Sequence, residues 1–318
     1  MTAARSSPAR VTMRDVATVA GVSTATVSKV LNDRPDVGPE VRQRVLETIS
    51  RLGYRVNTVA RGLRSRTTDT IAILTDDLEG IFTTALMRGV EEAASEYDIS
   101  VLLANSYGDP EKERKHLRRL LDRQVDGLII MSGNRVRPRS GPALPMPDTP
   151  YVFLYEYGMS EPVPSILPDD RGGAALAAQH LLDIGRRRIG FINGPASWEA
   201  TADRLDGVTA TLRAAGSVLD PSLVHHATSW SPEDGHRLTH AMLTRPDPPD
   251  AVFCASDDLA TGALAVHQRP PLTTVALPLL EMGRVAGQRL LAAVNGEPQR
   301  HELIRVPCEL RVRASTTR

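Results

Sequence analysis

Residues 13–32 of this 318-residue chain read MRDVATVAGVSTATVSKVLN, and this stretch decides the fold of the amino-terminal part. Thr12 and Asp15 have the spacing of a capping box, so the sequence predicts a helix that starts here and ends at Gly21. Ser23 is placed to cap a second helix. Two short helices joined by a turn that contains glycine are typical of a helix-turn-helix, whose second helix enters the major groove of DNA.

The second helix has two chemically different faces. Val27, Val30 and Leu31 share the face that is expected to pack inward. The opposite face is small, polar and basic: Lys29 is suited to donate to guanine, and the Ala25 methyl is suited to contact a thymine methyl. Neighbouring hydroxyl and amide side chains are suited to bind phosphates. The alternative is a plain three-helix bundle with a solvated face. The residues predicted to contact DNA in this domain are Thr12, Ser23, Thr24, Ala25, Thr26, Ser28, Lys29 and Asn32.

A third helix and an uneven charge distribution complete the amino-terminal part. Glycine, proline and glutamate at 38–40 indicate a helix start, and Gly53 indicates its end. We therefore expect a disordered arm at 1–11 and an all-α domain at 12–56. Residues 1–66 hold twelve Lys or Arg against five Asp or Glu, although the net charge of the whole chain is zero. A basic module on an acidic body favours binding to a polyanion, and the alternative is a solvated charged surface.

From residue 70 onward, apolar runs of strand length alternate with amphipathic helices. Continuous apolar strands between helices indicate parallel sheets covered on both faces, so the expected fold class is α/β, with two doubly wound subdomains. We expect 69–166 with 278–298 to form one subdomain, and 167–275 with 299–318 the other. Ligands of such sheets bind beyond the carboxyl ends of the strands. The expected strands are 70–75, 99–104, 125–131, 151–155, 188–192, 223–226 and 251–254, with a closing strand pair in 302–312; the expected helices are 82–97, 110–124, 172–184, 199–215, 232–243, 258–266 and 278–294.

The composition excludes several classes of protein. Hydrophobic residues make up 41% and charged residues 24%, which is ordinary for a soluble globular protein. No apolar run approaches the ~18 residues of a membrane span, and the first residues do not have the form of a secretory signal. Two cysteines are too few for a disulfide framework, and Cys254 lies in an apolar run that predicts a buried, inert thiol. We therefore expect a cytoplasmic protein.

The sequence offers little support for an enzyme or a metal site. It contains no dinucleotide-binding, phosphate-loop, nucleophile-elbow or zinc-protease motif, so no catalytic residue and no cofactor is predicted. The only adjacent histidines are His225 and His226, whose side chains would point to opposite faces of a strand, so no shared metal is predicted. Because doubly wound sheets host many enzymes, an α/β enzyme remains the alternative from another class.

Residues 13–32 also resemble the DNA-binding headpiece of the lactose/galactose repressor (LacI/GalR) family. The resemblance continues through GYRVN at 53–57, DGLI at 126–129, SDDLATG at 256–262, PPLTT at 270–274 and VRAST at 312–316. It implies a transcriptional regulator, in most relatives a repressor, that binds a pseudo-palindromic operator as a homodimer. It also implies a body that resembles periplasmic sugar-binding proteins and holds a small effector, typically a sugar, between its subdomains.

The resemblance assigns roles to further residues. In the family, the segment at 57–68 is a hinge that becomes helical on operator, where a leucine that matches Leu63 wedges into the minor groove. Asn57 and Ala60 belong to the same hinge, and Val56 stands where the family usually has proline. The positions that match the family's effector contacts are Phe82, Arg204, Trp230 and Asp257.

The sequence departs from the family after Gly262. Only residues 263–269 separate this glycine from Pro270, whereas a strand with its crossover needs on the order of 30 residues. We therefore expect one parallel strand to be missing, together with a carboxylate that contacts effector in the family, unless 275–277 or a partner chain fills the vacancy. The alternative function is accordingly a DNA-binding regulator whose sensor is defective and does not respond to effector.

Overall fold

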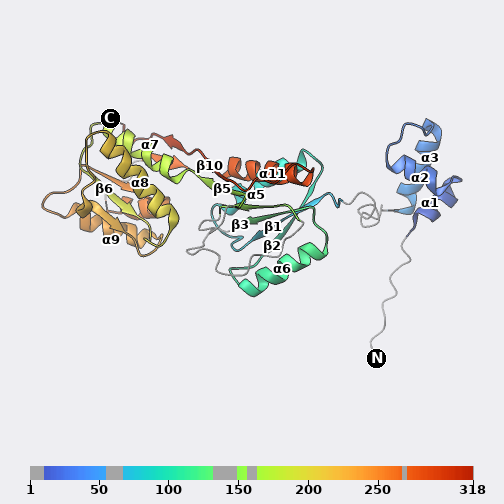
Figure 1. Ribbon diagram of the computed structural model, residues 1–318, viewed down its shortest axis with the longest axis horizontal. Coiled ribbons are helices and arrows are strands. Elements are labelled where there is room, and N and C mark those ends of the chain that lie inside the picture. Colours follow the sequence, from blue (N-terminus) through green and yellow to red (C-terminus); the bar gives the residue numbers. More distant parts are fainter. Residues whose placement is uncertain (1–10, 55–66, 132–148, 156–162, 267–270, 318) are drawn as a thin grey trace, which may run out of the picture. The chain divides into compact units, whose positions relative to one another are not determined.

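The computed structural model describes residues 11–54, 67–131, 149–155, 163–266 and 271–317. The chain forms two compact units, Met1–Thr68 and Asp69–Arg318, and each is described by itself (Figure 1). The predicted arm at 1–11 falls almost wholly outside the described residues, as does the predicted hinge at 57–68, of which only residues 67 and 68 are described. Among the described residues, no helix is both long enough and apolar enough to cross a membrane.

The first unit is a three-helix domain. Thr12 and Asp15 form the predicted capping box, with the Thr12 amide 2.8 Å from the Asp15 carboxylate. Gly21 takes the left-handed conformation, with φ at 66°, which turns the chain into the next helix. Val16, Ala17, Ala20, Val27, Val30 and Val45 form the core between the helices. The helices are α1 (Met13–Ala20), α2 (Thr24–Leu31) and α3 (Pro39–Leu52).

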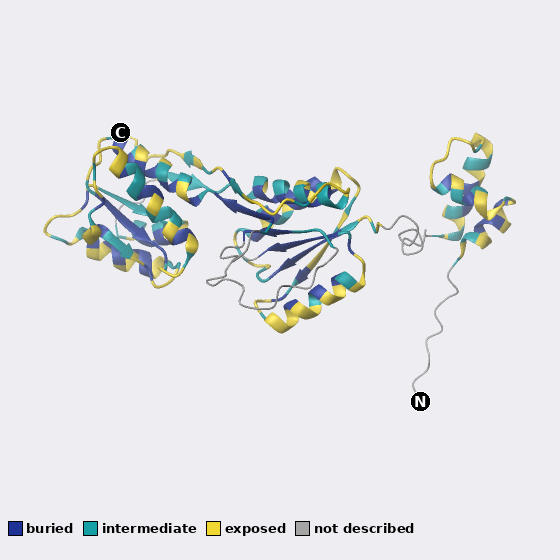
Figure 2. Ribbon diagram, viewed as in Figure 1, coloured by how far each residue is buried: buried dark blue, intermediate teal, exposed yellow. Residues whose placement is uncertain are grey.

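The second unit begins with a six-stranded parallel sheet in the order β10-β5-β4-β3-β1-β2. Helices α5 and α11 bury one face of this sheet, and α6 covers the other (Figure 2). The strands are β1 (Thr70–Thr75), β2 (Ser100–Asn105), β3 (Gly127–Met131), β4 (Tyr151–Leu154), β5 (Ser165–Pro168) and β10 (Leu303–Val306), and the helices are α5 (Thr83–Ser95), α6 (Pro110–Asp122) and α11 (Leu279–Val294).

A second, three-stranded parallel sheet follows, in the order β7-β6-β8. Helices α7 and α8 pack on one face, and α9 and α10 pack on the other. An antiparallel pair of short strands, β9 (Thr274–Ala276) and β11 (Glu309–Arg311), lies beside α7. The remaining elements are β6 (Ile189–Asn193), β7 (Val224–His226), β8 (Ala251–Cys254), α7 (Asp170–Asp183), α8 (Glu199–Ala214), α9 (Pro232–Leu243), α10 (Asp257–Leu264) and the short 3-10 helix Pro221–Leu223.

The structure corrects the expected assignment of the carboxyl-terminal segment. Residues 299–318 were expected to lie wholly with the second subdomain, but β10 pairs with β5 in the first sheet and only β11 lies with the second. The two strands predicted in 302–312 therefore exist but do not pair with each other. Strand β5 was not predicted, because it is four residues long and has proline at both ends, at Pro164 and Pro168.

The three-stranded sheet ends at β8. Within the described residues, β8 pairs with β6 on one side and with no strand on the other. The segment at 275–277 does not fill this vacancy, because β9 pairs with β11 instead. All four residues of β6 that face β8 are buried, whereas all four residues of β8 are only partly buried. The outer edge of β8 is therefore open.

Candidate DNA-contacting face and effector cavity

Helix α2 carries a polar surface on the face opposite its core. Val27 and Val30 are buried against α1 and α3, whereas Thr24, Ala25 and Lys29 are exposed. Ser28 and Thr26 are partly buried, and Asn32 is exposed at the carboxyl-terminal cap. The structure thus places the predicted DNA-contacting residues of α2 at the surface of the domain.

Several of these side chains already have partners inside the domain. The Thr12 hydroxyl donates to the Asp15 carboxylate at 2.7 Å, and the Ser23 hydroxyl accepts from the Thr26 amide at 3.1 Å. The Asn32 amide nitrogen donates to the Ser28 carbonyl at 2.8 Å. Thr12, Ser23 and Asn32 therefore cap helices whether or not DNA is present, and their remaining lone pairs and protons are what a phosphate can use.

Lys29 makes an ion pair within the domain. Its ammonium lies 2.6 Å from the carboxylate of Asp36, and both side chains are about half exposed. This pair lowers the pKa of Asp36, chiefly through the hydrogen bond from Lys29. An exposed pair of this kind contributes little to stability, because solvent screens it, so a DNA base or phosphate competes with Asp36 at little cost. The predicted hinge contacts Asn57, Ala60 and Leu63 lie outside the described residues.

A cavity of about 600 Å³ opens in the second unit, and all four predicted effector-contacting residues line it. Phe82 comes from the turn before α5, in the first subdomain. Arg204 comes from α8, Trp230 from the turn before α9, and Asp257 from the first turn of α10, all in the second subdomain. The mouth of the cavity therefore lies between the two subdomains, at the carboxyl ends of the strands.

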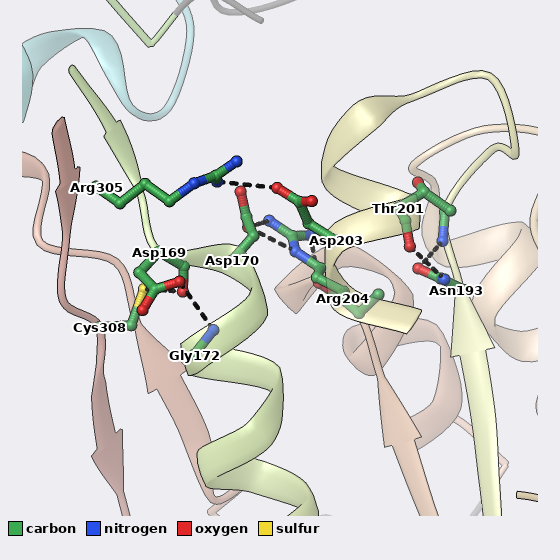
Figure 3. A network of polar contacts seen from close by, with 11 residues as sticks. Asp169, Asp170, Gly172, Asn193, Thr201, Asp203, Arg204, Arg305 and Cys308 are labelled. Atoms are coloured by element: carbon green, nitrogen blue, oxygen red, sulfur yellow. Dashed lines mark hydrogen bonds and ion pairs between the residues drawn. The ribbon is translucent and has the colours of Figure 1, made fainter. Parts of the chain in front are cut away.

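Arg204 is held in place at this mouth by two elements (Figure 3). Its guanidinium lies 2.7 Å from the carboxylate of Asp170, which is almost fully buried at the start of α7. A second nitrogen donates to the carbonyl of Ala255, which follows β8, at 2.7 Å. Because the buried charge is paired and hydrogen-bonded, the guanidinium has a fixed position and orientation.

Four aromatic rings surround the mouth. Phe82 packs against Tyr155 with 5.4 Å between ring centroids, and Trp198 meets Trp230 edge to face at 5.7 Å. The Arg204 guanidinium lies 5.5 Å from the centre of the Trp230 ring. The indole nitrogen of Trp230 is buried and has no hydrogen-bond partner among the residues that the structure describes. These rings supply flat apolar surfaces of the kind that pack on the C–H faces of a sugar or on another ring.

Asp257 and the subdomain junction provide the remaining polar contacts. The Asp257 side chain is exposed and accepts a hydrogen bond of 3.1 Å from the Thr274 hydroxyl. At the junction, Arg305 of β10 donates to Asp203 of α8 at 2.9 Å (Figure 3). This ion pair links the first sheet to the second subdomain.

Three residues at the mouth were not identified from the sequence. Tyr155 follows β4 directly, so the rule that ligands bind beyond the carboxyl ends of parallel strands would have identified it. Asp170 was missed because the helix was predicted to begin two residues later, at Gly172. Trp198 follows β6 and is one of only two tryptophans in the chain, which was a usable signal.

Cys254 and Cys308 are both free thiols, and burial raises the pKa of each to about 12. Both are therefore protonated at neutral pH and poor nucleophiles. Within the described ranges, no group of three His, Cys, Asp or Glu side chains is arranged to hold a metal ion.

The fold and the cavity define a class of protein: a two-subdomain, small-molecule-binding body in one chain with a helix-turn-helix domain. Three family models match the chain. Residues 12–57 match "Bacterial regulatory proteins, lacI family", and residues 68–274 match "Periplasmic binding proteins and sugar binding domain of LacI family". Residues 264–316 match "Periplasmic binding protein-like domain". The chain belongs to the LacI family of bacterial regulatory proteins.

Individual relatives agree over nearly the whole length. Catabolite control protein A of Priestia megaterium is 33% identical, with 96% of this chain and 99% of the relative covered. The transcriptional repressor PurR of Haemophilus influenzae is 30% identical, with 96% and 98% covered. Among solved structures, the Lac repressor dimer bound to operator and an anti-inducer matches with a TM-score of 0.80 at 25% identity, covering 96% of this chain and 99% of that one. The protein is thus a DNA-binding transcriptional regulator.

Proposed function

We propose that this protein is a sequence-specific repressor that binds a pseudo-palindromic operator as a homodimer and is gated by a small molecule at the mouth of its cavity. The observation that carries the proposal is the small, polar and basic outer face of α2, set by the buried Val27 and Val30 on its inner face. A helix of this kind fits the major groove. The Lac repressor that it resembles is a dimer on operator DNA, which supports the homodimer.

The cavity supports gating by a small molecule. Phe82 belongs to the first subdomain and Arg204, Trp230 and Asp257 to the second, so one ligand that touches all four stabilises one arrangement of the subdomains. A sugar is the expected class, because aromatic faces and charged hydrogen-bonding groups meet there. A solved relative, the regulator CelR, is described in complex with cellobiose and has a TM-score of 0.64 to this chain. The alternative is a regulator whose sensor does not respond.

The test is selection of bound sequences from random DNA by the full-length protein, followed by titration on the selected site. We expect the selected sequences to form a pseudo-palindrome. Lys29→Ala should relax the base preference at one position of each half-site by ~1–3 kcal/mol.

Leu63→Ala should weaken binding to the selected site but leave binding to random DNA nearly unchanged, because a wedge acts only through deformation of the central base step. Lys115→Ala, which removes an exposed lysine of α6, is the matched control and should change neither. A selection that yields no enriched sequence would contradict the proposal.

A further inference from the structure

The cavity does not stop at the carboxyl ends of the strands. Besides the mouth residues, its walls include all four residues of β8 and reach Asp250, before the amino end of that strand. Ile184, which follows α7, and Leu243, the last residue of α9, also line this far end. A strand of four residues spans ~13 Å, so the cavity runs along the open edge of β8 in addition to occupying the cleft between the subdomains.

The part of the cavity along β8, called the channel from here on, has mostly apolar walls, although His180, Arg186, Asp250 and Thr316 also line it. α7, α10 and the segment that includes β9 all contribute to these walls. Within the described residues, only one unpartnered and almost fully buried side-chain polar atom lines the cavity away from its mouth: the hydroxyl oxygen of Thr239, a residue that is 3% exposed. The channel is lined by Leu181, Ile184, Val252, Leu264, Val275 and Leu277.

The volume is too large for a small polar ligand at the mouth alone. A cavity of ~150 Å³ is enough to enclose benzene, whereas this cavity measures about 600 Å³. Pockets of ~300–1,000 Å³ hold drug-sized ligands, which bury most of their surface against apolar walls. A single sugar ring at Trp230 would leave the channel uncovered, and water in the channel would find few polar groups to bind.

The mouth, by contrast, is polar on one side. It presents the fixed Arg204 guanidinium, the exposed Asp257 carboxylate and the unpartnered indole nitrogen of Trp230. Polar groups gather at the mouth, whereas apolar side chains predominate along the channel. There His180 bonds Thr316 and Asp250 accepts from the Arg187 amide, and Arg186 is exposed at the far end.

We infer that the effector is an amphiphilic small molecule, with a polar head such as a sugar ring at the mouth and an apolar group at least as large as benzene in the channel beside β8. That this ligand acts as an effector rests on the proposed function, whereas its binding to the channel is measured separately. The open edge of β8 adds backbone hydrogen-bonding groups to the channel, because an edge strand leaves alternate N–H and C=O groups unpaired. The Thr239 hydroxyl gives a second polar contact inside, so an apolar group with one polar substituent fits best.

The test uses 2-naphthol as the probe, since it combines a fused ring with one hydroxyl. Calorimetric titration of the full-length protein should show one bound 2-naphthol per chain, and D-glucose, D-galactose and D-ribose should each bind at least tenfold more weakly. Ala263→Phe places a ring in the channel from α10 and should weaken 2-naphthol binding at least tenfold. Ala241→Phe is the matched control, because Ala241 is exposed on α9 and does not line the cavity, and it should leave binding unchanged.

A folding control accompanies the binding measurements, and three results would each contradict a stated claim. Thermal melts establish that Ala263→Phe folds, and Leu264→Trp, which blocks the same channel, replaces it if it does not. A monosaccharide that binds more tightly than 2-naphthol, with both channel variants indifferent to 2-naphthol, would overturn the inference. So would a shift in the dimer–monomer balance on Ala263→Phe without probe binding, since a strand from a second copy would then occupy the edge. Failure to select an operator would refute the proposed function, while 2-naphthol binding would still report on the channel.

Discussion

Trp230 owes its position to a glycine. A Cβ built on Gly194 would lie 2.0 Å from the Trp230 ring, so only glycine lets the indole lie flat over the end of β6. In that position the ring meets both Trp198 and the Arg204 guanidinium. Gly194 therefore fixes the aromatic wall of the mouth without touching a ligand itself.

We expect Gly194→Ala to displace Trp230, because a methyl group and a ring atom cannot share that space. The overpacking should cost ~1–3 kcal/mol of stability, and the tryptophan emission spectrum should change. Urea unfolding and emission spectra measure the two effects. Gly38→Ala is the matched control, because it adds a methyl into open space at a negative φ. An unchanged emission spectrum in Gly194→Ala would show that the ring does not depend on this glycine.

Asp234, in the first turn of α9, accepts several hydrogen bonds from the turn that carries Trp230. It accepts hydrogen bonds from Arg237, from the hydroxyl and amide of Thr228, and from the amide of Ser229. These donors, led by Arg237, hold the pKa of Asp234 well below its usual value of 3.8. Burial alone would raise this pKa, but the hydrogen-bond donors outweigh it, so Asp234 is ionised in the folded protein.

A group whose pKa is depressed by folding stabilises the protein at pH values above its unfolded pKa and loses that effect as the pH falls toward its folded pKa. We therefore expect Asp234→Asn to lower the unfolding free energy by ~1–3 kcal/mol at pH 7. The difference from the parent protein should be constant down to about pH 5 and shrink below about pH 4. Urea unfolding at a series of pH values checks this. Glu233→Gln, at the exposed neighbouring position, should show no such trend.

At the scale of elements, the crossing of α5 and α11 depends on small residues. A Cβ on Gly283 of α11 would lie 2.1 Å from the backbone carbonyl of Leu86 in α5, and one on Gly89 of α5 would lie equally close to the carbonyl of Leu280. The two helix backbones are therefore in direct contact where they cover the six-stranded sheet. Backbone atoms have no rotamer to change, so neither helix can yield without moving as a whole.

We expect Gly283→Ala to destabilise the body by ~1–3 kcal/mol, even though alanine favours a helix over glycine by ~1 kcal/mol. Chemical denaturation monitored by far-ultraviolet circular dichroism measures the sign. Gln288→Ala on the exposed face of α11 is the comparison and should be near neutral. A more stable Gly283→Ala protein would mean that the helices separate easily.

The same scale shows how far the sequence predicts the structure. Helices α1 and α2 of the amino-terminal domain could be predicted from local signals, because caps, a left-handed glycine and a stripe of valines lie within twenty residues. Strand β5 could not be found in this way, since its partner β10 is distant in sequence and its own signal is four residues that follow Pro164 and end at Pro168. The four residues that match the family's effector contacts were predicted from resemblance, and the structure brings them to one cavity. Asp170 depends on an ion pair with a helix 34 residues away, which no local pattern reveals.

At the scale of the whole molecule, charge is divided between the two units. Residues 1–66 hold twelve basic and five acidic residues, so a dimer presents two strongly basic domains. If six to ten phosphates are contacted, the affinity for operator should fall ~10³–10⁵-fold between 50 and 200 mM salt, because bound counterions are released. Fluorescence anisotropy over a salt series measures the slope. Glu47→Lys, at an exposed site of α3, should strengthen binding to random DNA at low salt. A response that is flat with salt would rule out this mode of binding.

The order of strands in the six-stranded sheet also has a consequence for synthesis. The sheet begins at residue 70, yet its edge strand β10 and its covering helix α11 come from 279–306. At ~5–20 residues per second, a ribosome needs roughly 7–27 s to add the residues between Pro168 and Leu303. The amino-terminal domain, whose three helices are contiguous in sequence, leaves the ribosome complete long before this. During the interval Gly89 of α5 and the free edge of β5 have no partner, so the nascent body exposes unpaired backbone and apolar surface, which favours aggregation, for longer than the three-helix domain does.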